Sequence, residues 1–387
     1  MIYRFVADRH SQHFLVDELR LPAVAQYVAN VTRETYPDLK IPYHSRWRHF
    51  DAGGINRWEE LVSSMRADAL ERARAAVDLV TVSVLLDAGA GDAWRYRDAR
   101  TGAYFARSEG LAIASLDMFR AGIFSSEPQH PWRVDAAALA VMTAGTLARY
   151  FQVDERNPLL GLDGRTTLLR RLGEALVANA DLFGEAPARP GHLVDYFLKA
   201  ATDRHISAEA VLAPVLNGLA CIWPSGLTFK GFAVGDAGRH HAVRTSDASN
   251  GIVPFHKLSQ WLTYSLIEPL NAVGLIVDDI SELTALPEYR NGGLLVDLGA
   301  IVPRSGINAK QEHPVYSELV VEWRALTVTL MDRLLDLVRA PLAMDATFTL
   351  RQMLQGGTWM AGRKIARELR PPDGTPPIRV AADGTVF

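Results

Sequence analysis

Apolar residues recur three and four positions apart along most of this chain, and this helical periodicity restricts the possible folds more than any other feature. The stretch ALERARAAVDLVTVSVLL (69–86) has charges early and none late, so it predicts a helix that begins exposed and ends buried. The stretch RSEGLAIASLDMFRAG (107–122) predicts a second helix, with Gly122 as its stop signal. Pro254 suits the first position of another helix, and Pro269 would end that helix. Further helices are predicted at about 133–150, 165–179, 207–220, 255–267, 315–339 and 344–369.

The whole chain, 1–387, is predicted to form a single large helical domain of mostly α class. Strand signals are few, strands do not alternate with helices, and no loop is long and polar enough to link independent domains. We expect an N-terminal arm over 1–56, a helical core over 69–340, and a C-terminal helix and hairpin over 341–387. The hairpin is indicated by Asp383–Gly384, which lies between β-forming residues.

Charge and cysteine content exclude several classes of function. The net charge of −3 gives no global attraction to nucleic acid or to an anionic membrane. Cys221 is the only cysteine, so the chain has no internal disulfide and no thiolate zinc cluster. The N-terminus MIYRFVADRH lacks the features of a secretory signal, and no window approaches the ~18 uninterrupted apolar residues of a membrane span. We therefore expect a cytoplasmic protein with no nucleic-acid partner and no membrane partner.

The common phosphate, metal and nucleophile motifs are absent from the sequence. The stretch GDAGRHH (235–241) is rich in glycine, but no strand precedes it and no strong helix follows it, so it predicts a surface turn. His240, His241 and His256 do not predict a metal site. Adjacent histidines are expected to point in different directions, and no carboxylate lies at a helical ligand spacing from them. We assign no metal ligand from the sequence.

Three carboxylates in apolar surroundings are the strongest candidates for chemistry. Asp87 closes the first predicted helix, Asp279 follows the run AVGLIVDDI, and Glu288 falls in the first turn of a helix, where the helix dipole stabilises an anion. Structural roles also fit these residues: Asp87 and Asp279 suit the capping of turns, and Glu288 suits an ion pair with Arg290 or the N-terminal turn of a helix. Gly292–Gly293 would cost this helix about 1 kcal/mol each relative to alanine, which indicates close approach by another helix or by a ligand.

The stretch GIVPFHKLSQWLTYSL (251–266) adds polar groups to an apolar, aromatic-rich helix. His256, Lys257 and Gln260 are spaced three and four apart, so they cover one side of the helix together with the neighbouring Trp261. Lys257 is either a solvated surface lysine or a charge that faces a cavity, since the segment around it is almost uncharged. We include all four residues among the candidate substrate-binding residues.

Four segments closely resemble the uracil-catabolism protein family of the Urc4/Urg3 type, over about residues 75–301. They are VSVLLDAGAGDAWRY, RSEGLAIASLDMFRAG, NGIVPFHKLSQWLTYSLIEPL and LTALPEYRNGGLLVDLG. The resemblance implies a place in a pyrimidine-degradation route in which uracil, carried as a ribosyl compound, is opened and ends as urea.

The same landmarks distantly resemble the queuosine-salvage N-glycosidases, which implies a helical fold related to the helix-hairpin-helix DNA glycosylases. Those enzymes cleave a base from ribose 5-phosphate with an aspartate, and Glu288 stands at the position of that aspartate. Where those enzymes carry Pro-Gln, this chain has Gly292–Gly293, displaced by one position. Because the acid is longer and the glutamine is missing here, the resemblance does not extend to the base of the substrate. It does extend to FHKLSQ, DISELTALPEYRNGGLLVDLG and VVEWRAL, and thus to Lys257, Gln260, Asp279, Tyr289, Arg290, Leu294, Gly299, Glu322 and Arg324.

These resemblances imply an N-glycoside hydrolase that acts on a small nucleoside-like or nucleotide-like compound, a ribosylurea with or without a 5-phosphate. Glu288 would stabilise the oxocarbenium-like transition state and orient water, with Asp87 or Asp279 as its partner acid. Lys257, Arg290 or His256 would hold a phosphate, and the reaction requires no metal or redox cofactor.

Two other functions remain as alternatives. An amidohydrolase acting on the ring-opened pyrimidine would ordinarily need a metal or a catalytic nucleophile. A non-catalytic binding protein of the same pathway would hold the ligand without turnover. A DNA glycosylase is disfavoured, because the chain is mildly acidic and has no basic stripe.

Overall fold

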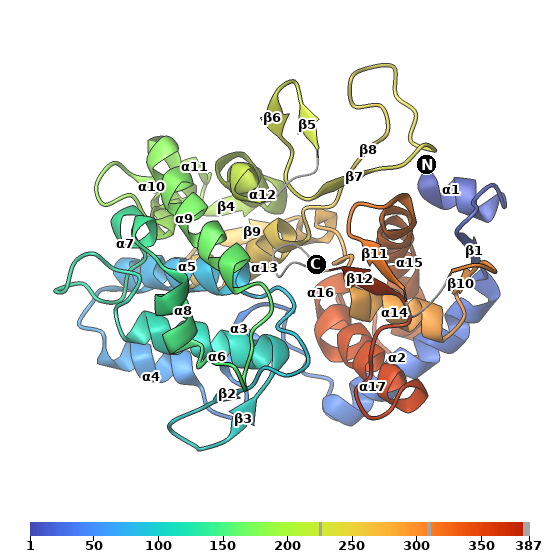
Figure 1. Ribbon diagram of the computed structural model, residues 1–387, viewed down its shortest axis with the longest axis horizontal. Helices are drawn as coiled ribbons and strands as arrows, with labels where there is room; N and C mark the ends of the chain where they lie inside the picture. The colour runs from blue at the N-terminus through green and yellow to red at the C-terminus, as the bar shows by residue number, and fades with distance from the viewer. Residues whose placement is uncertain (224–226, 308–310, 382–387) are drawn as a thin grey trace. The chain divides into compact units, whose positions relative to one another are not determined.

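The computed structural model describes residues 1–223, 227–307 and 311–381. Over these residues the chain divides into two compact units, whose elements are labelled in Figure 1. Unit 1 contains residues 1–44, 227–257 and 283–381, and unit 2 contains residues 45–223 and 258–282. Helices make up most of the regular structure in both units, which confirms the prediction of a mostly α fold. Whether the two units together form one domain depends on how they are joined, so the single domain stays a prediction.

The helices of unit 2 surround α5 (Ala69–Leu85). Asp68 caps α5 by accepting a hydrogen bond from the Glu71 N–H, and every residue from Ala75 to Leu85 is buried. The predicted helix that begins exposed and ends buried is thereby confirmed. The other helices are α3 (Trp47–Phe50), α4 (Arg57–Ser64), α6 (Arg107–Arg120), α7 (Ala136–Ala140), α8 (Ala144–Tyr150), α9 (Leu162–Ala178), α10 (Ala180–Phe183), α11 (Leu193–Ala200), α12 (Ala208–Leu219) and α13 (Lys257–Ala272) from its second residue.

Helix α13 departs from its prediction at both ends. It continues past Pro269 to Ala272, so the prediction that Pro269 ends it is wrong. Proline has no N–H, which leaves the Ser265 carbonyl without its helical donor, but the indole Nε1–H of Trp47 donates to that carbonyl at 2.8 Å. Pro254 is also not helical, because it ends the strand β8 (Ile252–Pro254) and the helix begins only at Lys257.

The long helix α15 (Glu318–Leu342) is the central helix of unit 1. Helix α2 (Leu21–Thr35) packs along it, and α14 (Tyr289–Asp297) packs against both α15 and α17 (Trp359–Leu369). Figure 1 shows α2, in blue, beside α17, in red, although these helices are far apart in the sequence. The remaining helices are α1 (Ile2–Ala7) and α16 (Leu350–Met353), and α16 joins α17 through the π turn Leu354–Thr358.

Strands are short and occur only in two-stranded ladders within the described part of the chain. Unit 1 contains β1 (Phe14–Val16) antiparallel to β10 (Ile301–Pro303), β5 (Thr228–Phe229) antiparallel to β6 (Phe232–Ala233), β7 (Ala237–Arg239) antiparallel to β8, and β11 (Glu312–Pro314) parallel to β12 (Arg379–Ala381). Unit 2 contains β2 (Tyr96–Arg97) antiparallel to β3 (Tyr104–Phe105), and β4 (His205–Ser207) parallel to β9 (Ile276–Asp278).

Three expectations from the sequence need comment. The helix expected at 133–150 is two helices, because Thr143 starts α8 anew by accepting a hydrogen bond from the Thr146 N–H. The expected hairpin at Asp383–Gly384 lies outside the described residues. Within the described residues, no helix combines the length and the apolar character that a membrane crossing needs.

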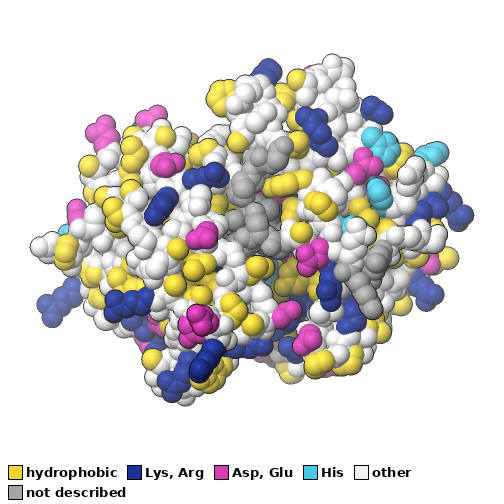
Figure 2. Space-filling view, viewed as in Figure 1, with side chains coloured by type: hydrophobic (Ala, Val, Ile, Leu, Met, Phe, Trp, Pro, Cys, Tyr) yellow, Lys and Arg dark blue, Asp and Glu magenta, His cyan; other side chains and the backbone are white. Residues whose placement is uncertain are grey.

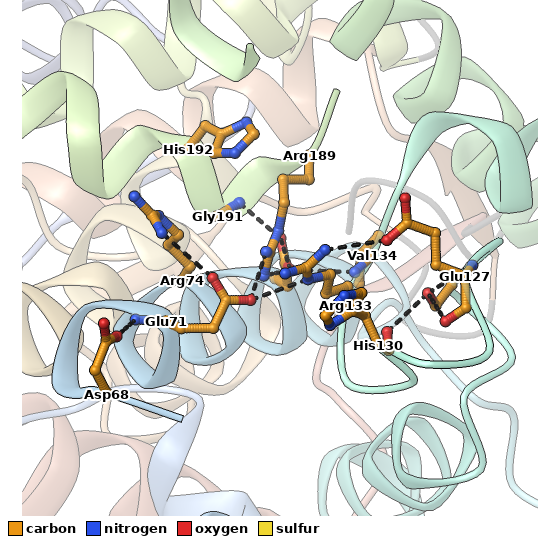
Figure 3. Close-up of polar contacts among 12 residues, drawn as sticks. Asp68, Glu71, Arg74, Glu127, His130, Arg133, Val134, Arg189, Gly191 and His192 are labelled. Carbon is orange, nitrogen blue, oxygen red and sulfur yellow. Dashed lines mark hydrogen bonds and ion pairs between the residues drawn. The ribbon is translucent and has the colours of Figure 1, made fainter. Parts of the chain in front are cut away.

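A buried network of ion pairs fixes two loops of unit 2 to α5 (Figure 3). Asp78, fully buried, accepts hydrogen bonds from Nε and Nη2 of Arg189 at 2.9 and 2.5 Å, and from the N–H groups of Val134 and Gly191. Glu71 accepts hydrogen bonds from Arg189 at 2.7 Å and from Arg133 at 3.0 Å. The segments around residues 134 and 190 are therefore anchored to α5 by hydrogen bonds and by charge.

We predict that Glu71 makes the stability of unit 2 sensitive to acid. Burial raises the pKa of Glu71, but the hydrogen bonds and charges of Arg189 and Arg133 outweigh it and lower the pKa from 4.5 to about 2. A carboxyl group whose pKa is lower in the folded state contributes stability above its unfolded pKa and loses it as pH falls through its folded pKa. The free energy of unfolding should therefore fall between about pH 4.5 and pH 2, and Glu71→Gln should reduce this slope in urea titrations.

The control for this experiment is Glu127→Gln. Glu127 bonds the same Arg133, at 3.2 Å, but its side chain is 42% exposed. Its replacement should leave the pH dependence of stability close to that of the wild type. Parallel pH profiles for wild type and Glu71→Gln would contradict the assignment.

Candidate functional site

Glu288 lies immediately before α14 and acts as its N-cap. Its two carboxylate oxygens accept hydrogen bonds from the N–H groups of Arg290, at 2.7 Å, and Asn291, at 2.6 Å. Burial raises the pKa of Glu288, and these two N–H groups and the charges of Lys257 and Arg290 only partly oppose the increase. The residue is nevertheless partly exposed. It is therefore a carboxyl group of raised pKa on a residue that is partly exposed.

Lys257 is the first residue of α13 and is buried. Its main-chain N–H donates to Asp236 Oδ2 at 3.0 Å. Its ammonium charge acts on the carboxyl groups of both Glu288 and Asp236, lowering the pKa of each. The structure thus confirms neither a solvated surface lysine nor a phosphate contact, but it places a positive charge close to the Glu288 carboxylate.

Asp236, which the sequence analysis missed, forms a two-point ion pair with Arg324. The guanidinium donates from Nη1 to Oδ1 and from Nη2 to Oδ2, both at 2.7 Å, and both side chains are buried. Arg324 also lies 4.1 Å from the ring centre of Phe255 and donates from Nε to the carbonyl of Pro287 at 3.3 Å. The pair therefore supports the residue directly before Glu288.

The stretch GDAGRHH is not the surface turn that the sequence predicted. Its Ala237–Arg239 form the strand β7, and a Cβ atom at Gly238 would collide with Val321 of α15. The strand was missed because it is only three residues long and its packing partner is 83 positions away, counted from 238 to 321. The contact with Val321 distinguishes this strand from a glycine turn, and a single sequence does not reveal that contact.

Tyr289, Arg290 and Gly292 make contacts within unit 1. The Arg290 guanidinium lies 4.8 Å from the ring centre of Tyr289 and donates from Nη1 to the Gly374 carbonyl at 3.0 Å. A Cβ atom at Gly292 would lie 2.8 Å from both Trp323 Nε1 and Thr327 Oγ1 of α15. The sequence left open whether the glycines meet a helix or a ligand, and at Gly292 the neighbour is a helix.

His256 has a positive φ of 47°, an uncommon conformation for a residue with a Cβ atom. Its N–H donates to the Asp236 carbonyl at 3.0 Å, which holds this conformation. Burial lowers the pKa of His256, while the charge of Asp236 opposes the decrease. His256 therefore tends to be neutral beside the charged Lys257.

Glu322 belongs to a different group of contacts. Its carboxylate accepts a hydrogen bond from Ser11 and pairs with Nε2 of His240 at 2.8 Å, and both carboxylate and imidazole are fully buried. The rings of His240 and His241 stack with their centres 4.9 Å apart, and His241 Nδ1 lies 2.8 Å from Glu318 Oε1. The expectation that the adjacent histidines point in different directions is wrong, because both rings pack against the edge of Phe5.

Asp87, in unit 2, is bound to Arg46. The two side chains approach to 2.8 Å, and the Ser108 hydroxyl donates to Asp87 Oδ2 at 3.1 Å. Arg46 is fully buried and also donates from Nε to Ser83 Oγ at 2.7 Å. The arginine that pairs with Asp87 lies 41 positions earlier, counted from 46 to 87, where no local pattern reveals it.

The other candidates in unit 2 differ in their surroundings. Trp261 and Gln260 are buried in α13, and the Arg46 guanidinium lies 5.5 Å from the ring centre of Trp261. Asp279 is exposed, with a positive φ of 52°. Unit 2 thus brings Asp87 and Trp261 to one arginine, while Asp279 lies on its surface.

Unit 1 therefore contains a carboxyl group of raised pKa, the charge of Lys257 acting on it, and a buried ion pair that contacts the preceding residue. This arrangement suits acid–base or electrostatic chemistry on a small polar ligand.

Comparison with known proteins identifies the family of the chain. The chain belongs to the family DUF1688, described as a protein of unknown function, which it matches over residues 1–387. It is 41% identical over 384 residues to protein urg3 of Schizosaccharomyces pombe. The aligned region covers 97% of this chain and 92% of that protein. It is 37% identical over 412 residues to uracil catabolism protein 4 of Lachancea kluyveri. Here the aligned region covers 98% of this chain and 93% of that protein. These relatives confirm the resemblance to the Urc4/Urg3 type.

We predict that Gly292→Ala destabilises unit 1, because the added methyl group has no room between α14 and α15. Overpacking of this kind costs about 1–3 kcal/mol of unfolding free energy, measurable by urea titration. Gly145→Ala is the matched control, since Gly145 is exposed in α8 and its Cβ would meet nothing closer than 3.8 Å. That control should be neutral or stabilising by up to about 1 kcal/mol. Equal stability of the two variants would show that the contact at Gly292 is loose.

Proposed function

We propose that this protein is an N-glycoside hydrolase of uracil catabolism, acting on a ribosylurea-type compound with or without a 5-phosphate. Glu288 carries the proposal, as a partly exposed carboxyl group of raised pKa beside the charge of Lys257. The name of the Lachancea kluyveri relative supports the pathway. The resemblance to queuosine-salvage N-glycosidases supports the reaction class and a glycosylase-like arrangement of the helices.

The reaction breaks the bond between C1 of ribose and a urea nitrogen. The oxygen of one water molecule bonds to C1, one proton of that water passes to a base, and an acid gives a proton to the departing nitrogen. The products are ribose, or its 5-phosphate, and urea. The balance needs water alone and no oxidant or reductant.

Glu288 fits the role on the sugar side. Positive charge develops at C1 and the ring oxygen in the transition state, and a nearby carboxylate lowers its energy. A carboxyl group whose pKa is raised toward neutrality is also a better acceptor of a proton from water. Its two hydrogen bonds from the α14 N–H groups hold the carboxylate in one orientation.

The two sequence candidates for the acid that protonates urea, Asp279 and Asp87, both belong to unit 2. Of the two, Asp87 is the weaker candidate, because its ion pair with Arg46 favours the charged form. Arg324 is a positioning residue, because it acts on Lys257 and Glu288 only indirectly, through its contacts with Asp236 and with the Pro287 carbonyl. The remaining candidates for contact with the ligand in unit 1 are His256, Tyr289 and Arg290, whereas Glu322 is fully buried against His240.

The direct test is incubation of the full chain with ribosylurea and with its 5-phosphate, following urea and the ribose species. Equal release of urea and ribose would support the hydrolase. Release of ammonia without free ribose would favour an amidohydrolase. Saturable binding without any product would favour a non-catalytic binding protein.

Glu288→Gln should reduce turnover by roughly 10²–10⁴, the range for groups that act by acid–base or electrostatic catalysis. Glutamine keeps the size and can accept hydrogen bonds, but it offers no negative charge to the transition state. Ligand affinity should change much less, because the charge acts mainly in the transition state. Turnover, ligand affinity and thermal melts should be measured together.

The control is Asp68→Asn, which alters an exposed helix cap of α5. It should cost up to about 1 kcal/mol of stability and leave turnover intact. If Glu288→Gln behaves in the same way, Glu288 is only a helix cap and the proposal for this residue fails.

Lys257→Met should weaken binding of the 5-phosphorylated ligand more than binding of the unphosphorylated one. Loss of a charged hydrogen bond to phosphate costs about 1.5–3 kcal/mol, which is at least a tenfold change in Kd. Lys364→Met, which removes a surface lysine bound to Glu34, is the control and should change neither Kd. Equal weakening of both ligands would show that Lys257 acts on Glu288 and not on phosphate.

A further inference from the structure

Two histidines and a glutamate meet at the surface of unit 1, apart from the contacts of Glu288. Ligand atoms of His240, His241 and Glu318 all lie within 4.8 Å of one another. The histidines directly follow β7, and Glu318 is the first residue of α15. Figure 2 shows histidine side chains grouped beside acidic ones near the chain end that Figure 1 marks N. We propose that these three residues bind a divalent transition-metal ion of the zinc class.

The donor set suits this class of ion. Two imidazole nitrogens with one carboxylate oxygen form a set used by zinc, which leaves a further position for water or a ligand. His241 Nδ1 and Glu318 Oε1 already lie 2.8 Å apart, and the main-chain N–H of His241 donates to Glu318 Oε2. His13 approaches the same carboxylate, with Nε2 3.7 Å from Oε1, and offers a third nitrogen, and thus a fourth donor atom, from the N-terminal segment.

The surroundings of His240 resemble the outer shell of a metal site. Nε2 of His240 pairs with Glu322 at 2.8 Å, and Glu322 also accepts a hydrogen bond from Ser11. When Nε2–H donates to this carboxylate, the tautomer is set and the lone pair lies on Nδ1, the atom left for a metal. Nδ1 now accepts the Ala242 N–H at 3.1 Å, so an ion would replace this hydrogen bond.

A modest rearrangement would complete the site. Ligand atoms about 2.0–2.1 Å from a zinc ion lie about 3.3 Å from one another, so the three groups would close by up to about 1.5 Å. The rings of His240 and His241 are inclined by only 16°, and stacked rings cannot both direct a lone pair at one ion. The ring of His241 must therefore turn, and its 51% exposure leaves it room to do so.

The test uses zinc ion as the probe and untagged full-length protein freed of metal by a chelator. Calorimetry should give one zinc ion per chain with a Kd in the micromolar range or below. His241→Ala and Glu318→Gln should each raise that Kd at least tenfold. These exposed positions are chosen because removal of His240 would leave Glu322 buried without its partner, and thermal melts should show that both variants fold.

His205→Ala is the matched control. His205 is as exposed as His241 and its Nδ1 also lies 2.8 Å from a carboxylate, that of Asp278. This variant should bind zinc as the wild type does. Absence of stoichiometric binding in the wild type would overturn the proposal, and so would equal weakening by all three variants, which would indicate adventitious surface binding. No substrate enters the assay, so the result is independent of the proposed hydrolase function.

Discussion

The ion pair between Asp236 and Arg324 holds together the segments of unit 1 that carry the candidate site. The Asp236 carboxylate binds the guanidinium and the Lys257 N–H, while its main-chain carbonyl accepts the N–H groups of Phe255 and His256. Arg324 extends the network to the Pro287 carbonyl. Both charges are buried, and a buried charge without its partner is strongly destabilising. The positions of Lys257 and Glu288 are therefore set by the same interaction.

Unit 2 uses the same device with other residues. Asp78 is paired with Arg189, and Asp87 is paired with Arg46. The burial of each acid is tolerated because the arginine and further hydrogen bonds satisfy its carboxylate. The apolar surroundings that marked Asp87 as a chemical candidate are thus equally the surroundings of a structural ion pair. Glu288 differs from both in its partners, because, among the described residues, only main-chain N–H groups are seen to hold its carboxylate, whereas each of the other two acids has an ion pair with an arginine.

Local patterns predicted what local forces decide. Helices α5, α6, α9, α12 and α15 begin within about three residues of the predicted positions, since their periodicity and caps lie within the helices themselves. Pro269 was misjudged because the compensating donor, Trp47, lies 222 positions away, counted from 47 to 269. Asp236 and the stacked histidines were missed for the same reason: Arg324, Glu318 and Phe5 lie on distant segments that a single sequence does not connect. The resemblance supplied Lys257, Glu288 and Arg324, but not the residue that joins them.

The sequence treated a helix cap and a reactive acid as competing roles for Glu288, yet the structure makes them compatible. Each carboxylate oxygen has two lone-pair positions, and one main-chain N–H occupies only one of them. Two main-chain N–H groups therefore leave part of the hydrogen-bonding capacity of the carboxylate for other donors. Capping fixes the orientation of the group, burial raises its pKa, and Lys257 limits the increase. A helix N-terminus can therefore hold a carboxylate in place without using up its capacity to react.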